Sequence, residues 1–488
     1  MRELLFRLML SIAIASATLI SLPASASDRT ADPRIKQMES GLLPRVALKA
    51  DVGHTYSIQQ RMRSLGIPGA SIAVIDQGKV VFTRAYGLSD TVEKTPATTE
   101  TLFQAGSISK PVAALGALRL VKEGKLSLDE DVNTKLRTWH VPENEFTKDD
   151  KVTLRRLVSH TAGLTVHGFP GYAAGTQIPT VVQVLNGEPP ANTAAVRVDV
   201  RPGSVYRYSG GGYTVMQLMM GDVANESFES FMQTKVLDVL GMKSSTYAQN
   251  PLPALASRRA SGHQPGGARI PGKLHTYPEM AAAGLWTTPS DLAQYVIYVQ
   301  NAVRGDTGAL LNESLAKELV TRQQGGQHGL GPQIFEVGEF ASFGHGGVDE
   351  GFEAVVAASV AHGKGVVIMA NTNGAFGFFD EVRASVARTY DWPGFESTPQ
   401  LEAVPVSAWL LQRAPGKYQL SPDRTATLVA KQGRLFLELF DGGQFEVLAK
   451  SATELYAPYG SITMRLVEVD GKVTAMKRSD GAEFPRLD

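Results

Sequence analysis

Two pairs of strand-like runs stand far apart in the chain, and together they constrain its fold. Residues 67–90 form one pair around a turn at 76–79, and residues 350–374 form another that turns at 362–365. Runs of β-branched residues on both sides of such turns are typical of β-hairpins. The sequence between the pairs has mostly helical patterns and Gly/Pro-rich loops. We therefore expect one antiparallel sheet built from both ends of a domain, with a helical region inserted between them.

The composition of the chain changes after Pro415. About eight short runs of strand-like residues follow, separated by turn signals such as those at 441–443 and 470–471. The runs are "GKYQL", "ATLVAK", "RLFLELF", "QFEVLAK", "ELYA", "SITMRLVEV", "KVTAMKR" and "EFPRL". Many short strands in so short a segment predict a small closed or sandwich β-domain.

The first 26 residues have the pattern of a secretory signal peptide. Arg2 and Arg7 precede an apolar stretch, and the small-residue run 24–26 follows it. This order predicts export, to the periplasm or the medium, with cleavage after Ala26. The alternative is an uncleaved membrane anchor, because the stretch nearly reaches the roughly 18 residues that can span a bilayer. Serine and alanine interrupt the stretch, so we favour export, and no later segment is long and apolar enough to span.

Charge and cysteine content exclude several classes of function. The chain has 48 lysines and arginines and 48 aspartates and glutamates, so its formal net charge is zero. A chain without net positive charge has no overall electrostatic attraction for nucleic acid or an anionic membrane. The chain has no cysteine, which excludes disulfides, thiolate catalysis and cysteine metal sites. His160 and His167 lack paired carboxylates at ligand spacing, and no glycine-rich stretch matches a nucleotide-binding loop. We expect no metal, no other cofactor, and a small neutral or zwitterionic substrate as partner.

A serine and a lysine three positions apart stand at the start of a predicted helix. In "GSISKPVAALGALRLVKEGK", Ser107 and Lys110 precede an apolar stripe. Side chains at i and i+3 are neighbours on a helix, and a helix N-terminus favours developing negative charge. Ser107 is therefore a candidate nucleophile with Lys110 as its base. A bare S-x-x-K pattern also occurs by chance in many proteins, so the pair alone does not establish a site.

Two further stretches carry candidate site residues. In "RPGSVYRYSGGGYTVMQLMM", Tyr208 precedes a glycine run and a predicted amphipathic helix, so its hydroxyl could face a cleft. It could equally be a tyrosine packed at the entrance of the helix. In "FGHGGVDEGFE", His345 and two glycines lead into the second strand pair, where a substrate could lie along the backbone. A lone histidine is more often structural.

Together these three stretches resemble the serine penicillin-recognising superfamily, which includes class C β-lactamases, DD-peptidases, D-aminopeptidases and family VIII esterases. The resemblance covers residues 67–374. Five further segments look like recurrent segments of that family, and they occur in the family's order. They are "IPGASIAVIDQGKVVFTRAYG", "LVKEGKLSLDEDV", "VTLRRLVSHTAGL", "LGMKSSTY" and "AAAGLWTTPSDLA". Eight matching segments in one order are not expected by chance.

The resemblance implies a role for each motif residue. Ser107 matches the acylated nucleophile, Lys110 the basic partner of S-x-x-K, and Tyr208 the tyrosine of Y-x-N. Either Lys110 or Tyr208 could be the general base that takes the serine proton. The oxyanion hole of the family would be formed by the backbone N–H groups of Ser107 and Val348.

Two positions depart from the β-lactamase pattern. His345-Gly346-Gly347 stands in place of K-T-G, and Gly210 stands where Y-x-N has its asparagine. A neutral histidine and a missing amide weaken the recognition of a β-lactam carboxylate and of its acylamide group. We therefore expect a substrate site, formed by Gly210, His345, Gly346, Gly347 and Val348, that suits other acyl compounds better than penicillins.

These observations predict an α/β (α+β) fold of the β-lactamase/DD-peptidase type, followed by a lipocalin-like β-domain. The expected function is an exported serine hydrolase that forms an acyl-enzyme on Ser107 and acts on small esters or D-amino-acid-containing peptides. The alternatives are a class C-like β-lactamase and a non-catalytic penicillin-binding or sensor protein of the same fold. The sequence does not define the oligomeric state. The expected divisions are a signal peptide at 1–26, a linker and first helix at 27–55, the hydrolase domain at 56–400, a linker at 401–414 and the β-domain at 415–488.

Overall fold

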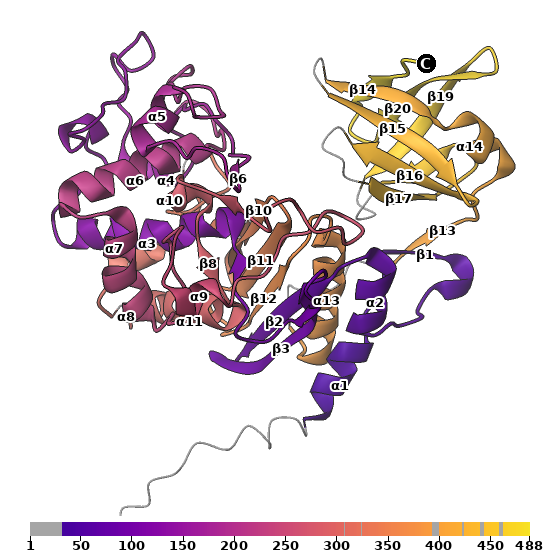
Figure 1. Ribbon diagram of the computed structural model, residues 1–488, viewed down its shortest axis with the longest axis horizontal. Coiled ribbons are helices and arrows are strands. Elements are labelled where there is room, and N and C mark those ends of the chain that lie inside the picture. The colour runs from indigo at the N-terminus through magenta and orange to yellow at the C-terminus, as the bar shows by residue number, and fades with distance from the viewer. Residues whose placement is uncertain are drawn as a thin grey trace, which may run out of the picture.

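The computed structural model describes residues 32–306, 308–323, 325–392, 400–421, 424–439, 444–457 and 462–488. The predicted signal peptide lies outside these residues. Figure 1 shows a helical region and a central sheet, with a barrel of strands at the C-terminal end of the chain.

A seven-stranded antiparallel sheet forms the centre of the hydrolase part. From one edge to the other its strands are β4 (Thr95–Pro96), β3 (Lys79–Asp90), β2 (Gly69–Asp76), β12 (Gly365–Ala370), β11 (Phe352–Ser359), β10 (Ser342–Asp349) and β9 (Gln333–Glu336). The N-terminal hairpin joins the C-terminal strands where β2 pairs with β12, and Ile72 lies opposite Ile368. The prediction of one sheet assembled from both ends of the domain is confirmed.

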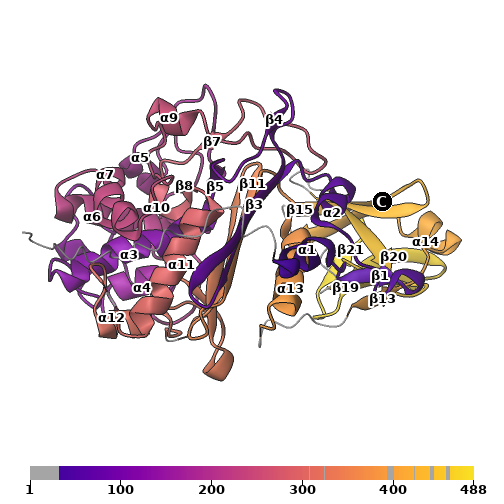
Figure 2. The same ribbon diagram turned by 90° about the horizontal axis from the view of Figure 1, so that it is seen from below.

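The chain between β4 and β9 holds most of the helices, joined by loops, as its sequence pattern predicts. Three other helices, α1, α2 and α13, lie on the opposite side of the sheet, between it and the barrel (Figure 2). The helices are α1 (Pro33–Ser40), α2 (Ile58–Leu65), α3 (Ser109–Lys122), α4 (Leu154–Val158), α5 (Val181–Asn186), α6 (Gly210–Ala224), α7 (Phe228–Met232), α8 (Asp238–Leu240), α9 (Pro253–Ala256), α10 (Met280–Ala283), α11 (Pro289–Val303), α12 (Glu313–Leu319), α13 (Phe376–Thr389) and α14 (Ala408–Arg413). Short helical turns are η2 (Lys49–Asp51), η3 (Gly106–Ile108), η4 (Val132–Thr134), η5 (Gln233–Leu237) and η6 (Gly338–Phe340).

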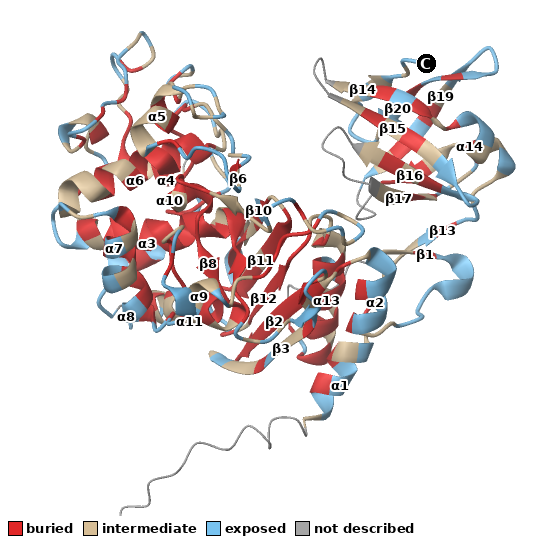
Figure 3. Cartoon of the chain, in the orientation of Figure 1, coloured by how far each residue is buried: buried red, intermediate tan, exposed pale blue. Residues whose placement is uncertain are grey.

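Helices cover both faces of the sheet, so its central strands are buried (Figure 3). Ile72 and Val74 of β2 pack in the core that includes α1, α2 and α13. Ala73 and Ile75 point to the other face, into the core shared with α11 and the helical region. This alternation follows from the two-residue period of a strand. The nearly continuous apolar sequence of β2 is typical of a strand that is buried on both faces.

The sequence predicted an amphipathic helix after Tyr208. The structure shows instead that this helix, α6, is enclosed on most sides. Ten of its 15 residues are buried. The reason is that α6 contacts α3, α4, α5, α7 and α10, so that few of its side chains reach solvent.

The last eight strands form a second antiparallel sheet that closes on itself. They follow one another in chain order, and a bridge between Tyr418 and Arg486 joins the first strand to the end of the chain. Each of the eight predicted runs coincides with one strand, which confirms the small all-β fold. The strands are β14 (Gly416–Ser421), β15 (Arg424–Lys431), β16 (Arg434–Leu439), β17 (Gln444–Ala449), β18 (Glu454–Tyr456), β19 (Thr463–Val469), β20 (Lys472–Arg478) and β21 (Glu483–Pro485).

Residues 401–414, expected as a linker, contain two ordered elements. Strand β13 (Leu401–Ala403) pairs in parallel with β1 (Val46–Leu48). Helix α14 contributes Leu410 to the core of the barrel. Elements this short have too few residues to show a helical or strand period in the sequence, so residues 401–414 resemble a linker. Two further pairs of short strands are β5 (Phe103–Gln104) with β8 (Trp286–Thr287), and β6 (Tyr172–Ala173) with β7 (His275–Thr276).

Candidate active site

The candidate nucleophile lies in the turn η3, which leads directly into α3. Gly106 precedes Ser107 with a φ of 52°, in the left-handed region that favours glycine. Ser109 fixes this turn, because its hydroxyl donates to the Gly106 carbonyl at 2.6 Å and accepts from the Leu285 N–H at 3.0 Å. Lys110 Nζ then lies 2.9 Å from Ser107 Oγ. The predicted serine–lysine pair is therefore in direct contact.

Lys110 is almost completely enclosed by protein. Its side chain donates a second hydrogen bond from Nζ to the Ala282 carbonyl at 2.8 Å. Burial lowers the pKa of Lys110 to about 7, although the nearby charge of Asp349 acts in the opposite direction. The ammonium form loses its hydration in the interior, so the neutral amine becomes accessible near neutral pH. A neutral amine at this distance can accept the proton of Ser107.

The structure brings Tyr208 to the same point. Its hydroxyl is close enough to Ser107 for the serine to lower the pKa of the phenol, and Lys110 Nζ lies 5.0 Å from the centre of its ring. Burial raises the pKa of Tyr208 well above its ordinary value. Tyr208 is therefore a protonated phenol at neutral pH, able to donate a hydrogen bond or to relay a proton.

His160 holds Tyr208 in position, a role that sequence reasoning missed. The two rings stack with their centres 4.1 Å apart, and His160 Nδ1 accepts the N–H of Ser209 at 3.0 Å. Burial lowers the pKa of His160, which keeps the ring neutral. His160 belongs to "VTLRRLVSHTAGL", one of the segments that resemble recurrent segments of the family. From the sequence alone this histidine is considered only as a possible metal ligand, and that role is rejected because no paired carboxylates lie at ligand spacing.

Strand β10 passes beside the nucleophile with one edge uncovered. Its pairing with β9 ends at Gly344, whereas its pairing with β11 continues to Asp349. A Cβ atom on Gly106 would overlap the backbone of Val348, and one on Gly347 would overlap the carbonyl oxygen of Ala105. Only glycine at these two positions allows the strand and the turn to approach so closely. The backbone nitrogens of Ser107 and Val348 are thereby held near one another, as an oxyanion hole requires.

His345 lies in β10 with its ring buried near Tyr208. Its Nδ1 is 2.5 Å from the Gly346 carbonyl, so this nitrogen carries the proton and Nε2 is left as an acceptor. Nε2 has no hydrogen-bond partner among the described residues. Burial lowers the pKa of His345 to about 4, and the charge of Lys110 acts in the same direction. A neutral imidazole therefore stands at this position, where K-T-G has a cationic lysine.

His328 is a second site histidine that the sequence did not reveal. It lies on the loop before β9, with its ring centre 5.4 Å from that of His345. The Tyr206 hydroxyl lies 3.1 Å from its Nδ1. Burial lowers the pKa of His328 to about 2, so it too is neutral. No motif spacing marks this residue, because the fold brings it to the site from a distant loop.

The space beside Gly210 is filled by an aromatic ring. A Cβ atom at this position would lie 3.0 Å from a ring carbon of Phe169 and 3.1 Å from the His167 carbonyl oxygen. The Gly210 N–H donates to that same carbonyl at 3.0 Å. The missing asparagine of Y-x-N is therefore replaced by the apolar surface of Phe169, which the sequence did not indicate.

Two carboxyl groups are buried beneath the site. Asp349 follows Val348 in β10, and Glu279 is the residue before α10. Burial raises the pKa of Glu279 to about 7 and that of Asp349 well above its ordinary value. Asp349 is therefore protonated more readily than an exposed aspartate. A protonated Asp349 carries no negative charge, so it does not raise the pKa of Lys110.

No group of three or more histidine, aspartate or glutamate side chains in the described ranges is arranged to hold a metal ion. None of the described helices has the length and apolar character needed to cross a membrane.

Comparison of the sequence with curated proteins gives distant relatives. Protein flp of Staphylococcus aureus (strain MRSA252) is 24% identical over 337 residues, which cover 65% of this chain and 62% of that protein. The match thus spans less than two thirds of the relative's length. Esterase EstB of Burkholderia gladioli is 36% identical over 105 residues, 22% of this chain and 26% of that protein.

Solved structures share the fold over a larger part of the chain. The octameric penicillin-binding protein homologue from Pyrococcus abyssi superposes with a TM-score of 0.59 and 18% identity, covering 88% of this chain and 98% of that one. D-amino acid amidase from Ochrobactrum anthropi SV3 has a TM-score of 0.56 and 19% identity, covering 68% of this chain and 96% of that one. The family model described as beta-lactamase matches residues 57–390, which is more than half of the sequence. The chain belongs to the beta-lactamase family.

Proposed function

We propose that this protein is an exported serine hydrolase that forms an acyl-enzyme on Ser107 and cleaves small esters or D-amino-acid amides and peptides. The observation that carries the proposal is the contact of 2.9 Å between Ser107 Oγ and the amine of Lys110, whose pKa is lowered to about 7. A serine hydroxyl is a weak nucleophile unless a base takes its proton, and this amine is a base in contact with it.

Acylation begins with the transfer of the Ser107 proton to Lys110. The Oγ atom forms a bond to the carbonyl carbon of the substrate, and the carbonyl oxygen becomes an oxyanion that accepts hydrogen bonds from the N–H groups of Ser107 and Val348. The bond to the leaving group then breaks. The departing alkoxide or amine takes the proton from Lys110, directly or through the Tyr208 hydroxyl, and leaves as an alcohol or amine.

Deacylation repeats these steps with water as the nucleophile. A water molecule gives a proton to neutral Lys110 and attacks the acyl carbon, and the Ser107 oxygen recovers a proton as it leaves. We assign Lys110 as the base in both halves, because burial raises the pKa of Tyr208 and keeps it protonated. In this scheme Tyr208 serves as a donor and proton relay.

The preference for esters and amides over β-lactams rests on two features of the site. His345 is neutral, so it offers no positive charge to a substrate carboxylate, which a lysine at this position would attract. Phe169 offers apolar surface where an amide would bind an acylamino group. The esterase and D-amino acid amidase among the proteins that resemble this chain are consistent with the same substrate classes. Export is proposed from residues 1–26 of the sequence alone.

Labelling with a fluorophosphonate tests the nucleophile. The wild-type protein should form one phosphonyl adduct, which mass spectrometry of the digested protein locates on Ser107. Ser107→Ala should abolish the adduct, whereas Ser40→Ala, at an exposed serine of α1, should leave it unchanged. Undiminished labelling of Ser107→Ala would contradict the assignment.

A β-lactamase is the second candidate function, because the family whose model matches the chain has that description. The kcat/KM values for p-nitrophenyl butyrate, D-alanine p-nitroanilide and nitrocefin, measured in one buffer, separate the two. We expect the ester or the D-anilide to be the best substrate. Nitrocefin turnover about tenfold more efficient than both would replace the proposal with a β-lactamase, at a difference of about 1.4 kcal/mol in activation free energy. A stable adduct without turnover of any substrate would indicate a binding or sensor protein instead.

A further inference from the structure

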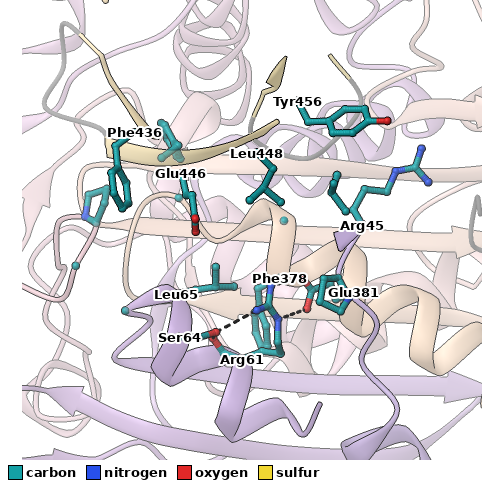
Figure 4. A pocket seen from close by; sticks show the side chains of 18 of the residues that line it. Arg45, Arg61, Ser64, Leu65, Phe378, Glu381, Phe436, Glu446, Leu448 and Tyr456 are labelled. Carbon is teal, nitrogen blue, oxygen red and sulfur yellow. Dashed lines mark hydrogen bonds and ion pairs between the residues drawn. The ribbon is translucent and has the colours of Figure 1, made fainter. Parts of the chain in front are cut away.

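A cavity lies between the hydrolase part of the chain and the C-terminal barrel (Figure 4). Its volume is about 510 Å³, within the range of roughly 300–1,000 Å³ that is typical of small-molecule sites. One wall comes from α2 and α13, and the other from strands β16, β17 and β18. None of the residues assigned above to catalysis lines this cavity. It is therefore a separate site.

Glycines keep the hydrolase side of the cavity open. Gly66, Gly266, Gly374 and Gly377 line it without side chains. The barrel contacts this side at Gly374, where an added Cβ atom would lie 3.4 Å from a ring carbon of Phe445. The two parts of the chain thus touch at one edge, and the space beside this contact is not filled by side chains.

Two of the four arginines that line the cavity are neutralised by acids in its wall. Arg61 forms a bidentate ion pair with Glu381, in which Nη2 and Nε donate to the two carboxylate oxygens at 2.6 and 2.7 Å. Arg434 pairs with Glu446 in the same way, with one contact of 2.6 Å. Each pair is neutral overall, so it adds no net charge to the cavity.

The other two arginines, Arg45 and Arg63, form no ion pair or side-chain hydrogen bond with any residue of the described chain. Asp380, the acid whose pKa responds to Arg45, is itself paired with Arg383 at 3.0 Å. A guanidinium presents a rigid set of N–H donors that matches the two oxygens of a carboxylate. The cavity therefore has a net positive charge carried by unpaired donors.

Apolar side chains line the rest of the cavity. Phe436 and Leu448 project from the barrel, and Leu65 and Phe378 face them from the hydrolase part (Figure 4). In this view Arg45 lies beside Leu448 and below the ring of Tyr456. Apolar surface next to a cationic group is complementary to a molecule with an apolar body and an anionic end.

We propose that this cavity binds a monocarboxylate with an apolar body, such as a medium-chain fatty acid. The carboxylate pairs with Arg45 and Arg63, and the body lies between Phe436 and Phe378. The apolar side chains beside the two unpaired arginines favour a carboxylate on an apolar body over a phosphate dianion. The proposal does not depend on the chemistry of Ser107.

Calorimetric titration of the full-length protein with octanoate tests the proposal. Octanoate should bind, whereas octylamine and octanol, which lack the carboxylate, should bind at least about tenfold more weakly. Arg45→Gln and Arg63→Gln should each weaken octanoate binding about tenfold, the scale of one lost charge-assisted hydrogen bond. Neither arginine is buried, so both variants should keep the thermal stability of the parent. Arg137→Gln, at an exposed arginine of the helical region, is the matched control and should bind normally.

Three outcomes would overturn the proposal. The first is no binding of octanoate at millimolar concentration. The second is unchanged binding in the Arg45→Gln, Arg63→Gln double variant, because the carboxylate would then bind elsewhere. The third is binding of octanol as tight as that of octanoate, because the cavity would then recognise apolar surface alone.

Discussion

Replacing Lys110 with methionine should abolish activity and at the same time stabilise the fold near neutral pH. The folded protein holds the pKa of Lys110 at about 7, whereas the unfolded chain has the ordinary value of 10.5. As the pH falls from 10.5 toward 7, the unfolded state binds a proton that the folded state does not bind, so the free energy of unfolding decreases. At about 1.4 kcal/mol per pH unit, the loss is about 4 kcal/mol at pH 7 but only about 1 kcal/mol at pH 10. Methionine at this position would not suffer this loss.

Urea unfolding followed by circular dichroism at the two pH values provides the measurement. The gain in unfolding free energy of Lys110→Met over wild type should be about 3 kcal/mol larger at pH 7 than at pH 10. Other groups that titrate in this range cancel in the difference between the two proteins. Lys36→Met, at an exposed lysine of α1, should show no such dependence. An equal effect of Lys110→Met at both pH values would mean that the folded protein keeps this lysine charged, which would exclude it as the base.

Three further predictions concern activity. If neutral Lys110 is the base, kcat/KM for p-nitrophenyl butyrate should rise about tenfold per pH unit below about pH 7 and level off above it; a flat profile would refute this. Gly347→Ala should lose activity and cost more than about 2 kcal/mol of stability, because the new Cβ atom would overlap the carbonyl oxygen of Ala105. Gly346→Ala, whose Cβ atom would make only an ordinary contact of 3.5 Å, should stay within about 1 kcal/mol of wild type in thermal unfolding. Tyr208→Phe should lower kcat by about 100-fold without moving the pH profile, and a shifted profile would indicate that the tyrosine is the base.

Local patterns in the sequence were sufficient for most of the fold. Runs of strand-like residues with turn signals between them predicted the hairpin of β2 and β3 and every strand of the barrel, because both signals are encoded in consecutive residues. The pairing of β1 with β13 was not predictable. Three-residue strands have no measurable period, and their partners lie at opposite ends of the hydrolase part.

The same distinction applies to the site. Ser107 and Lys110 share one helical turn, so their spacing alone predicted their contact. The burial that lowers the pKa of Lys110 could not be predicted in this way, since the Ala282 carbonyl and the ring of Tyr208 reach it from distant segments. Phe169 escaped notice for a related reason, because a sequence shows that an asparagine is missing but not which ring fills the space.

The parallel pairing of β1 with β13 has a consequence for how the barrel is attached. Gln400, next to β13, donates to the Pro44 carbonyl at 2.8 Å and accepts from the Gly53 N–H at 2.8 Å. A protease that cut between Trp392 and Gln400 would break the covalent connection and leave this backbone clasp intact. The N-terminal segment, and not only the polypeptide link, therefore holds the segment that leads into the barrel.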